Sequence, residues 1–179
     1  MSEPVEAYVA LGANVGEPIA QLVEAARQLD VHDQVSLPDA SSLWRTSPEG
    51  PVADQPDFIN AVVRIETLLT PQALLVHCQA IEKAMGRDRS QEVPFGPRPI
   101  DLDLLTYGEV VIDEEDLALP HPKLAERAFV LEPLRELNPS FVHPVTGRSV
   151  EDMLAALPPG QRVEKLGPLI LKLRLAPRK

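Results

Sequence analysis

The fold is decided by a stretch near the middle of the chain, residues 95–108, which reads FGPRPIDLDLLTYG. Within it, Asp101 and Asp103 alternate with Leu102 and Leu104. This period of two is typical of a β-strand with one buried face. We therefore expect a strand over residues 100–106, with both leucines facing the core and both aspartates on the opposite face.

Outward from this strand, apolar periodicity and turn residues predict an irregular mixture of strands and helices. Thr70 and Ser149 are suitable N-caps for two of the helices. The expected strands are 6–11, 41–46, 58–68 and 109–112, the last paired with 100–106, and the expected helices are 18–30, 71–85, 123–127, 129–137 and 150–157. This order favours a compact α+β sandwich over a doubly wound sheet.

With 179 residues, the chain is long enough for one domain, which we place at residues 1–160. Residues 161–179 form a basic C-terminal tail with six basic side chains and one acid. Residues 169–175 alternate loosely, and both an extra edge strand and a mobile arm remain open for this tail.

The net charge of −10 argues against a nucleic-acid-binding protein, because an acidic surface repels the phosphate backbone. No apolar run is long enough to span a bilayer, so we expect no membrane contact. The first residues lack the pattern of a secretory signal, and Cys78 is the single cysteine. We expect a cytoplasmic protein whose anionic substrate, if it has one, is held by a local cluster of arginines.

Asp101 and Asp103 are the candidate metal ligands. Two carboxylates on one strand face lie roughly 7 Å apart along the backbone and can converge on Mg²⁺, which prefers oxygen ligands. The alternative is an exposed acidic sheet edge. Basic side chains also occur on both sides of the pair in the sequence: Arg87, Arg89, Arg98, His121 and Arg127. They predict a clamp for polyphosphate, with surface salt bridges as the alternative.

Aromatic side chains in loops are candidates for holding a flat heterocycle by stacking. Phe95 lies in the arginine-rich loop, and Phe129 follows Arg127. Phe58 and Asn60 share one strand face, from which the amide can hydrogen-bond a ring edge. Burial in the core is the alternative for each ring.

Several motifs, taken in order, resemble one enzyme family, 6-hydroxymethyl-7,8-dihydropterin pyrophosphokinase of folate biosynthesis. The resemblance covers about residues 6–158. It rests on AYVALGANVG (7–16), RTSPEGP (45–51), DQPDFINA (54–61), HCQAIEKAMGR (77–87), FGPRPIDLDLLTYG (95–108), LPHP (119–122) and RAFVLEPL (127–134).

The resemblance implies a ferredoxin-like α/β sandwich with a mainly antiparallel sheet. It implies transfer of pyrophosphate from ATP to the hydroxymethyl group of the dihydropterin, with AMP released. It implies that Asp101 and Asp103 bind two Mg²⁺ ions. It also implies that the catalytic residues are these two aspartates together with Arg87, Arg89 and Arg98. It assigns ATP to Gln79, Glu82, Arg87, Arg89, Arg98, His121 and Arg127, and the pterin to Thr46, Pro48, Phe58, Asn60, Phe95 and Phe129.

Within this resemblance, Phe95 and Phe129 are expected to sandwich the pterin ring. The chain departs from the family pattern at Pro94, where an arginine is common. We expect a monomer whose partners are the two small substrates. The alternative functions are a metal-dependent phosphohydrolase acting on a nucleotide and a non-catalytic binding module.

Overall fold

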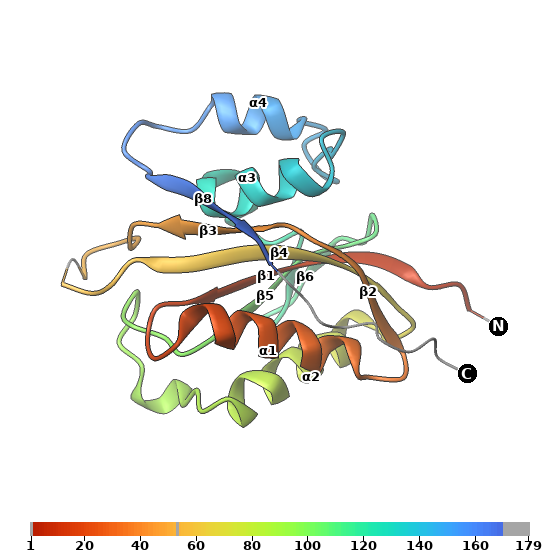
Figure 1. The fold of residues 1–179 in the computed structure, drawn as a ribbon. Coiled ribbons are helices and arrows are strands. Elements are labelled where there is room, and N and C mark those ends of the chain that lie inside the picture. Colours follow the sequence, from red (N-terminus) through yellow and green to blue (C-terminus); the bar gives the residue numbers. More distant parts are fainter. Residues whose placement is uncertain (1, 53, 170–179) are drawn as a thin grey trace.

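The computed structural model describes residues 2–52 and 54–169. One six-stranded antiparallel sheet lies between two layers of helices (Figure 1). Its strands are β1 (Val5–Ala13), β2 (Val35–Ala40), β3 (Ser42–Thr46), β4 (Phe58–Thr67), β5 (Asp101–Tyr107) and β8 (Val163–Pro168). They follow the order β5-β1-β4-β3-β8, and β2 also pairs with β4. The predicted α+β sandwich is confirmed.

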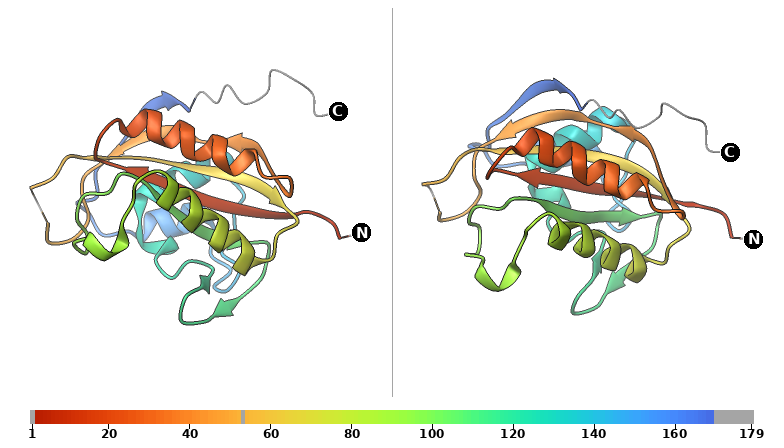
Figure 2. Two further views of the ribbon diagram at one scale, coloured as in Figure 1. Left: turned by 90° about the horizontal axis from the view of Figure 1, so that it is seen from below. Right: turned by 60° about the horizontal axis from the view of Figure 1, so that its bottom comes forward.

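Helices α1 (Pro18–Asp30) and α2 (Pro71–Ala84) cover one face of the sheet, as Figure 2 shows. Helices α3 (Ala128–Leu137) and α4 (Val150–Ala155) cover the other face (Figure 1). Short 3₁₀ turns span Arg89–Gln91 and Leu124–Glu126. Within residues 2–52 and 54–169, none of these helices has the length and apolarity needed to cross a membrane.

Helix α2 shows how local sequence sets these elements. The Thr70 hydroxyl accepts a hydrogen bond from the backbone N–H of Ala73, and Pro71 occupies the first turn, where it removes no helical hydrogen bond. Leu74, Cys78 and Ile81 are buried against the sheet. After the helix, Gly86 adopts a φ of +93°, which glycine tolerates, and the chain turns away.

The alternation in β5 divides its side chains between the two layers. Leu102 and Leu104 are buried in the core formed with α1 and α2, as predicted. Asp101 and Asp103 lie on the opposite face, where Leu105 joins the core formed with α3 and α4. Both aspartates therefore project from the sheet on the α3 side.

One predicted strand pairing is wrong. Residues 109–112 do not pair with β5; instead β6 (Ile112–Asp113) pairs with β7 (Ala118–Leu119). The turn of this hairpin lies in the acidic segment that follows β6, where the Glu114 N–H donates to the Leu117 carbonyl at 3.0 Å. Within 109–112, the Val110 N–H donates to the Tyr107 carbonyl and Ile112 pairs with Leu119, so this segment bonds to residues close in sequence. Beside β5 runs the chain after β7, where the His121 N–H donates to the Leu105 carbonyl.

β2 and β7 were not predicted. β2 contains Pro38 and Asp39, which are depleted in strands. β8 lies within residues 161–179, for which an extra edge strand was one of the two open alternatives, and it pairs with β3 at the sheet edge. The alternation predicted for residues 169–175 falls on residues 170–175, which lie outside the described part of the chain. The division of the chain at residue 160 stays a prediction.

Candidate active site

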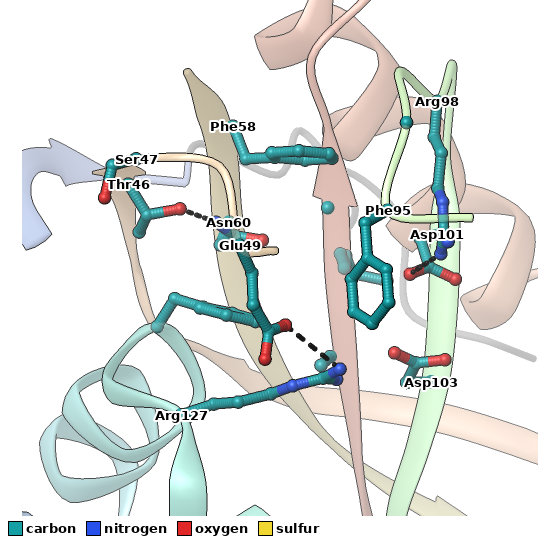
Figure 3. Close-up of a pocket in the computed structure, with 15 residues that line it drawn as sticks. Thr46, Ser47, Glu49, Phe58, Asn60, Phe95, Arg98, Asp101, Asp103 and Arg127 are labelled. Carbon is teal, nitrogen blue, oxygen red and sulfur yellow. Dashed lines mark hydrogen bonds and ion pairs between the residues drawn. The ribbon is translucent and has the colours of Figure 1, made fainter. Parts of the chain in front are cut away.

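A pocket lies at one end of the sheet, on the side covered by α3 (Figure 3). The register of the strands brings residues from four strands together at this end of the sheet. Gly12 of β1 stands opposite Asn60 of β4 on one side and Asp101 of β5 on the other. In β3, Thr46 stands opposite Phe58. Four strands that are far apart in the sequence, β1, β3, β4 and β5, therefore each contribute residues to the lining of the pocket.

The pocket contains most of the predicted site residues. It is lined by Ala10, Leu11, Gly12, Thr46, Ser47, Glu49, Phe58, Asn60, Phe95, Gly96, Arg98, Asp101, Asp103, Arg127 and Phe129. Pro48 and His121 are not among the lining residues. Gln79, Glu82, Arg87 and Arg89 instead line a separate cleft at the end of α2.

The two aspartates have different surroundings. Asp101 accepts hydrogen bonds from Arg87 at 2.7 Å and Arg98 at 3.2 Å. Burial disfavours its ionisation, but the two guanidinium groups outweigh burial and hold its pKa below the usual value. Asp103 has no hydrogen-bond or salt-bridge partner within residues 2–52 and 54–169. Burial, and then the neighbouring Asp101, raise the pKa of Asp103 to about 7.

This pair suits a divalent cation. Mg²⁺ is commonly bound by one or two carboxylates together with waters and substrate phosphates. In the described part of the chain no group of three histidine, cysteine or acidic side chains surrounds such a site. Any further ligands at Asp101 and Asp103 would therefore come from substrate and water. The unpartnered carboxylate of Asp103, directed into the pocket, is the observation that fits the ion (Figure 3).

Arg87 connects the cleft to the pocket. Its side chain is 2% exposed, and its guanidinium contacts Glu82, Glu92 and Asp101 at 2.5–2.7 Å. Glu82 is equally buried, and burial raises its pKa. It also accepts a hydrogen bond from the Leu102 N–H, at the start of β5. Arg87 therefore fixes the orientation of Asp101, while Arg89 remains more than half exposed at the cleft.

His121 is next to the pocket in its electrostatic contacts, with Arg127 and Asp101 among the charges that act on it, although it does not line the pocket. Its backbone is fixed by the hydrogen bond to Leu105, and its Nδ1 accepts from the Lys123 N–H at 3.1 Å. Burial, and then the positive charge of Arg127, lower the pKa of His121 to about 4. The imidazole is therefore neutral near pH 7 in the ligand-free protein.

Several lining residues were missed by the sequence analysis. Glu49 reaches across the pocket to Arg127, with 3.1 Å between Oε2 and Nη2 (Figure 3). Its signal was its place in the proline-rich RTSPEGP motif. Gly12 is required by space, because a Cβ there would lie 2.6 Å from the Asn60 side-chain oxygen. The motif marks Glu49 as a candidate, but no local pattern predicts its contact with Arg127 or the close approach of Gly12 to Asn60.

A hydrogen-bond network also joins three loops at this end. Asn14 donates to Gln55 at 2.9 Å, and Gln55 donates to the Phe95 carbonyl at 2.7 Å. Asn14 accepts from the Arg98 N–H at 2.8 Å. Phe95 has a φ of +61°, which is costly for a residue with a Cβ. The network helps to hold the backbone of Phe95 in this conformation beside the pocket.

Comparison with known proteins shows the family of the chain. The model of the family described as 7,8-dihydro-6-hydroxymethylpterin-pyrophosphokinase (HPPK) matches residues 8–139. The chain belongs to the HPPK family. An HPPK-family protein of Methylorubrum extorquens, 2-amino-4-hydroxy-6-hydroxymethyldihydropteridine pyrophosphokinase, is 42% identical over 160 residues, 88% of this chain and 98% of the relative. The enzyme of that name from Bacillus subtilis is 44% identical over 131 residues, 73% of this chain and 77% of the relative.

Other HPPK-family relatives are much longer. Folic acid synthesis protein fol1 of Schizosaccharomyces pombe is 41% identical over 152 residues, which are 85% of this chain but only 20% of that protein. The crystal structure of Plasmodium falciparum HPPK-DHPS wild type with pteroate has a TM-score of 0.67 at 16% identity. It covers 87% of this chain and 43% of that one, and it supports the fold.

Proposed function

We propose that this chain transfers the pyrophosphoryl group of ATP to the hydroxymethyl oxygen of 6-hydroxymethyl-7,8-dihydropterin, releasing AMP, as a step of folate biosynthesis. One observation carries the proposal. A pair of carboxylates suited to Mg²⁺ and a set of aromatic rings suited to a heterocycle line the same pocket. Membership of the HPPK family supports this pairing of a polyphosphate with a pterin.

The aromatic part of the pocket is proposed to hold the pterin. Phe58, Phe95 and Phe129 offer ring faces, and a stacked heterocycle gains roughly 0.5–1.5 kcal/mol beyond the burial of its area. Asn60 donates to the Thr46 hydroxyl at 2.6 Å, which fixes the orientation of its amide. A fixed amide next to a ring face can select the hydrogen-bonding edge of the pterin. We keep Pro48 as a proposed contact of this region.

The basic residues are proposed to hold ATP. Arg98 and Arg127 line the pocket, and Arg89 is the most exposed arginine of the neighbouring cleft. The remaining residues proposed for ATP are Gln79, Glu82 and Arg87 of the same cleft, and His121. Two Mg²⁺ ions bound by Asp101 and Asp103 would offset the charge of the triphosphate. Phosphoryl-type transfer depends mainly on such positioning and neutralisation, so the chain's own part is to align the hydroxyl with the β-phosphorus at about 3–3.5 Å.

All residues of the proposed site belong to one chain, and we therefore propose a monomer. Because the reaction consumes ATP, and because the only cysteine, Cys78, is buried and unpaired, we propose the cytoplasm as its compartment.

The direct test is incubation of the protein with ATP, Mg²⁺ and 6-hydroxymethyl-7,8-dihydropterin, followed by mass analysis. We expect the diphosphorylated pterin and AMP in equal amounts. Steady formation of AMP without the pterin would instead indicate a phosphohydrolase, an alternative that the relatives do not support. Omission of Mg²⁺ is expected to stop product formation.

Phe129→Ala tests the assignment of the aromatic wall. We expect the dissociation constant for the pterin to rise about tenfold, because the variant loses the stacking surface and the burial that goes with it. Binding of a non-hydrolysable ATP analogue, measured by calorimetry on the same sample, is the internal control and should change less than twofold. If the variant instead loses more affinity for the nucleotide than for the pterin, the assignments of the pterin and ATP regions are wrong and must be exchanged.

A further inference from the structure

The segment before β8 supplies a side chain that holds the backbone on both sides of Arg127. The Oε1 atom of Gln161 accepts a hydrogen bond from the Ala128 N–H at 2.8 Å. Its Nε2 atom donates to the Glu126 carbonyl at 2.9 Å. Gln161 lies outside residues 8–139, the part of the chain that matches the family model.

These contacts cap the N-terminus of helix α3. The first N–H groups of a helix have no partner within the helix, and they are usually satisfied by a side chain at the N-cap. Arg127 occupies that position, and its side chain makes no capping hydrogen bond. Instead the guanidinium of Arg127 is directed into the pocket, 5.4 Å from the centre of the Phe129 ring. Gln161 performs the capping from a distant segment, which leaves Arg127 available to the pocket.

The residues next to Gln161 contact the opposite wall. The Arg162 carbonyl accepts from the Ser47 N–H at 3.3 Å. Val163, the first residue of β8, stands opposite Thr46 in the register of β3 and β8. Three consecutive residues therefore connect the backbone that carries Arg127 and Phe129 with the backbone that carries Thr46 and Ser47. All four of these residues line the pocket.

We propose that Gln161 is a positioning residue for the reaction: it holds Arg127 and Phe129 at a fixed separation from Thr46 and thereby sets the width of the aromatic part of the pocket. This inference rests on the proposed function. Gln161 itself does not line the pocket, so it acts through the residues that it holds.

Gln161→Ala tests the inference, with Arg162→Ala as the matched control, because Arg162 contacts Ser47 through its backbone carbonyl. In Gln161→Ala we expect the KM for the pterin to rise about 3–10-fold, as loss of one or two hydrogen bonds would cause. The KM for ATP should rise by a smaller factor, because of the three arginines proposed to contact ATP only Arg127 is displaced, whereas Arg98 and Arg89 remain in place. Gln161→Glu keeps an acceptor for the Ala128 N–H and should recover at least half of the loss. Hydrogen exchange of the Ala128 amide, measured without ligand, should be faster in Gln161→Ala only.

The outcomes separate the two proposals. A wild-type protein that makes no pterin diphosphate overturns the proposed function and this inference with it. An active wild type whose Gln161→Ala variant keeps the same pterin KM overturns the positioning role alone. The positioning role is also overturned if Gln161→Ala lowers kcat, raises both KM values by the same factor and lowers the unfolding temperature, with no recovery in Gln161→Glu. That result would indicate a general loss of structure.

Discussion

Asp103→Asn is expected to lower kcat for pyrophosphate transfer by about 10²–10³-fold, the range seen when a charge-stabilising group is removed from an active site. The side chain keeps its size but loses the charge that the proposed Mg²⁺ needs. Asp113→Asn, an exposed acid in β6, is the matched control and should keep wild-type activity. The measurement is the initial rate of AMP formation with saturating ATP, Mg²⁺ and pterin. Normal activity in Asp103→Asn would end the assignment of this pair to the metal.

The same variant provides its own check on folding. Because the pKa of Asp103 is raised to about 7 in the folded chain, its ionisation above pH 7 opposes folding, whereas the unfolded chain ionises near pH 4 without this cost. The wild type therefore loses stability as the pH rises from about 4 to about 7, and the loss levels off at higher pH. Without metal, Asp103→Asn should unfold at a temperature at least roughly 2–4 °C higher than the wild type at pH 8, and the difference should shrink as the pH falls toward about 4. Lower stability at pH 8 would contradict this explanation.

Arg87→Ala is expected to destabilise the fold by about 3–5 kcal/mol, the usual cost of removing one partner from a buried ion pair. The change leaves Glu82, which is 2% exposed, without its buried counter-ion, and it frees Asp101 from one of its two arginines. Urea unfolding at pH 7.5 measures the loss. Arg89→Ala is the control on the same acid: its side chain is 57% exposed, so its loss should cost less than about 1 kcal/mol.

The pH dependence of Arg87→Ala follows from Glu82. Burial already raises the pKa of Glu82 while Arg87 is present, and removal of the arginine raises it further. The uncompensated charge is therefore lost as the pH falls, and the difference in stability between variant and wild type should shrink toward pH 5. The double variant Arg87→Ala/Glu82→Gln should be more stable than Arg87→Ala alone at pH 7.5. If both single arginine variants lose the same small amount, Arg87 has no special structural role.

Local sequence predicted the elements whose signals are complete within a few residues. The alternation of Asp101 to Leu104, the Thr70 cap and the glycine after α2 each specify an element through steric and hydrogen-bonding preferences of neighbouring residues. β2 and β7 were missed, and the bounds of β8 within the tail were not predicted. Their residues form strands only through pairing with β4, β6 and β3, and that pairing is not encoded in their own pattern. The pairing predicted for residues 109–112 was wrong for the same reason. The sequence pattern predicts a strand there, but it does not say which other strand pairs with it.

The candidate site divides in the same way. The sequence by itself determined the alternating strand that carries Asp101 and Asp103, the arginine-rich loop before it and the family motifs, because these depend on residue type and short spacing. The tertiary structure alone decided that Arg87 is buried among three carboxylates, that Glu49 pairs with Arg127 and that Gln161 caps α3. Those contacts join residues 5 to 78 positions apart, and they form only when burial of the two apolar faces of the sheet brings the loops to one end.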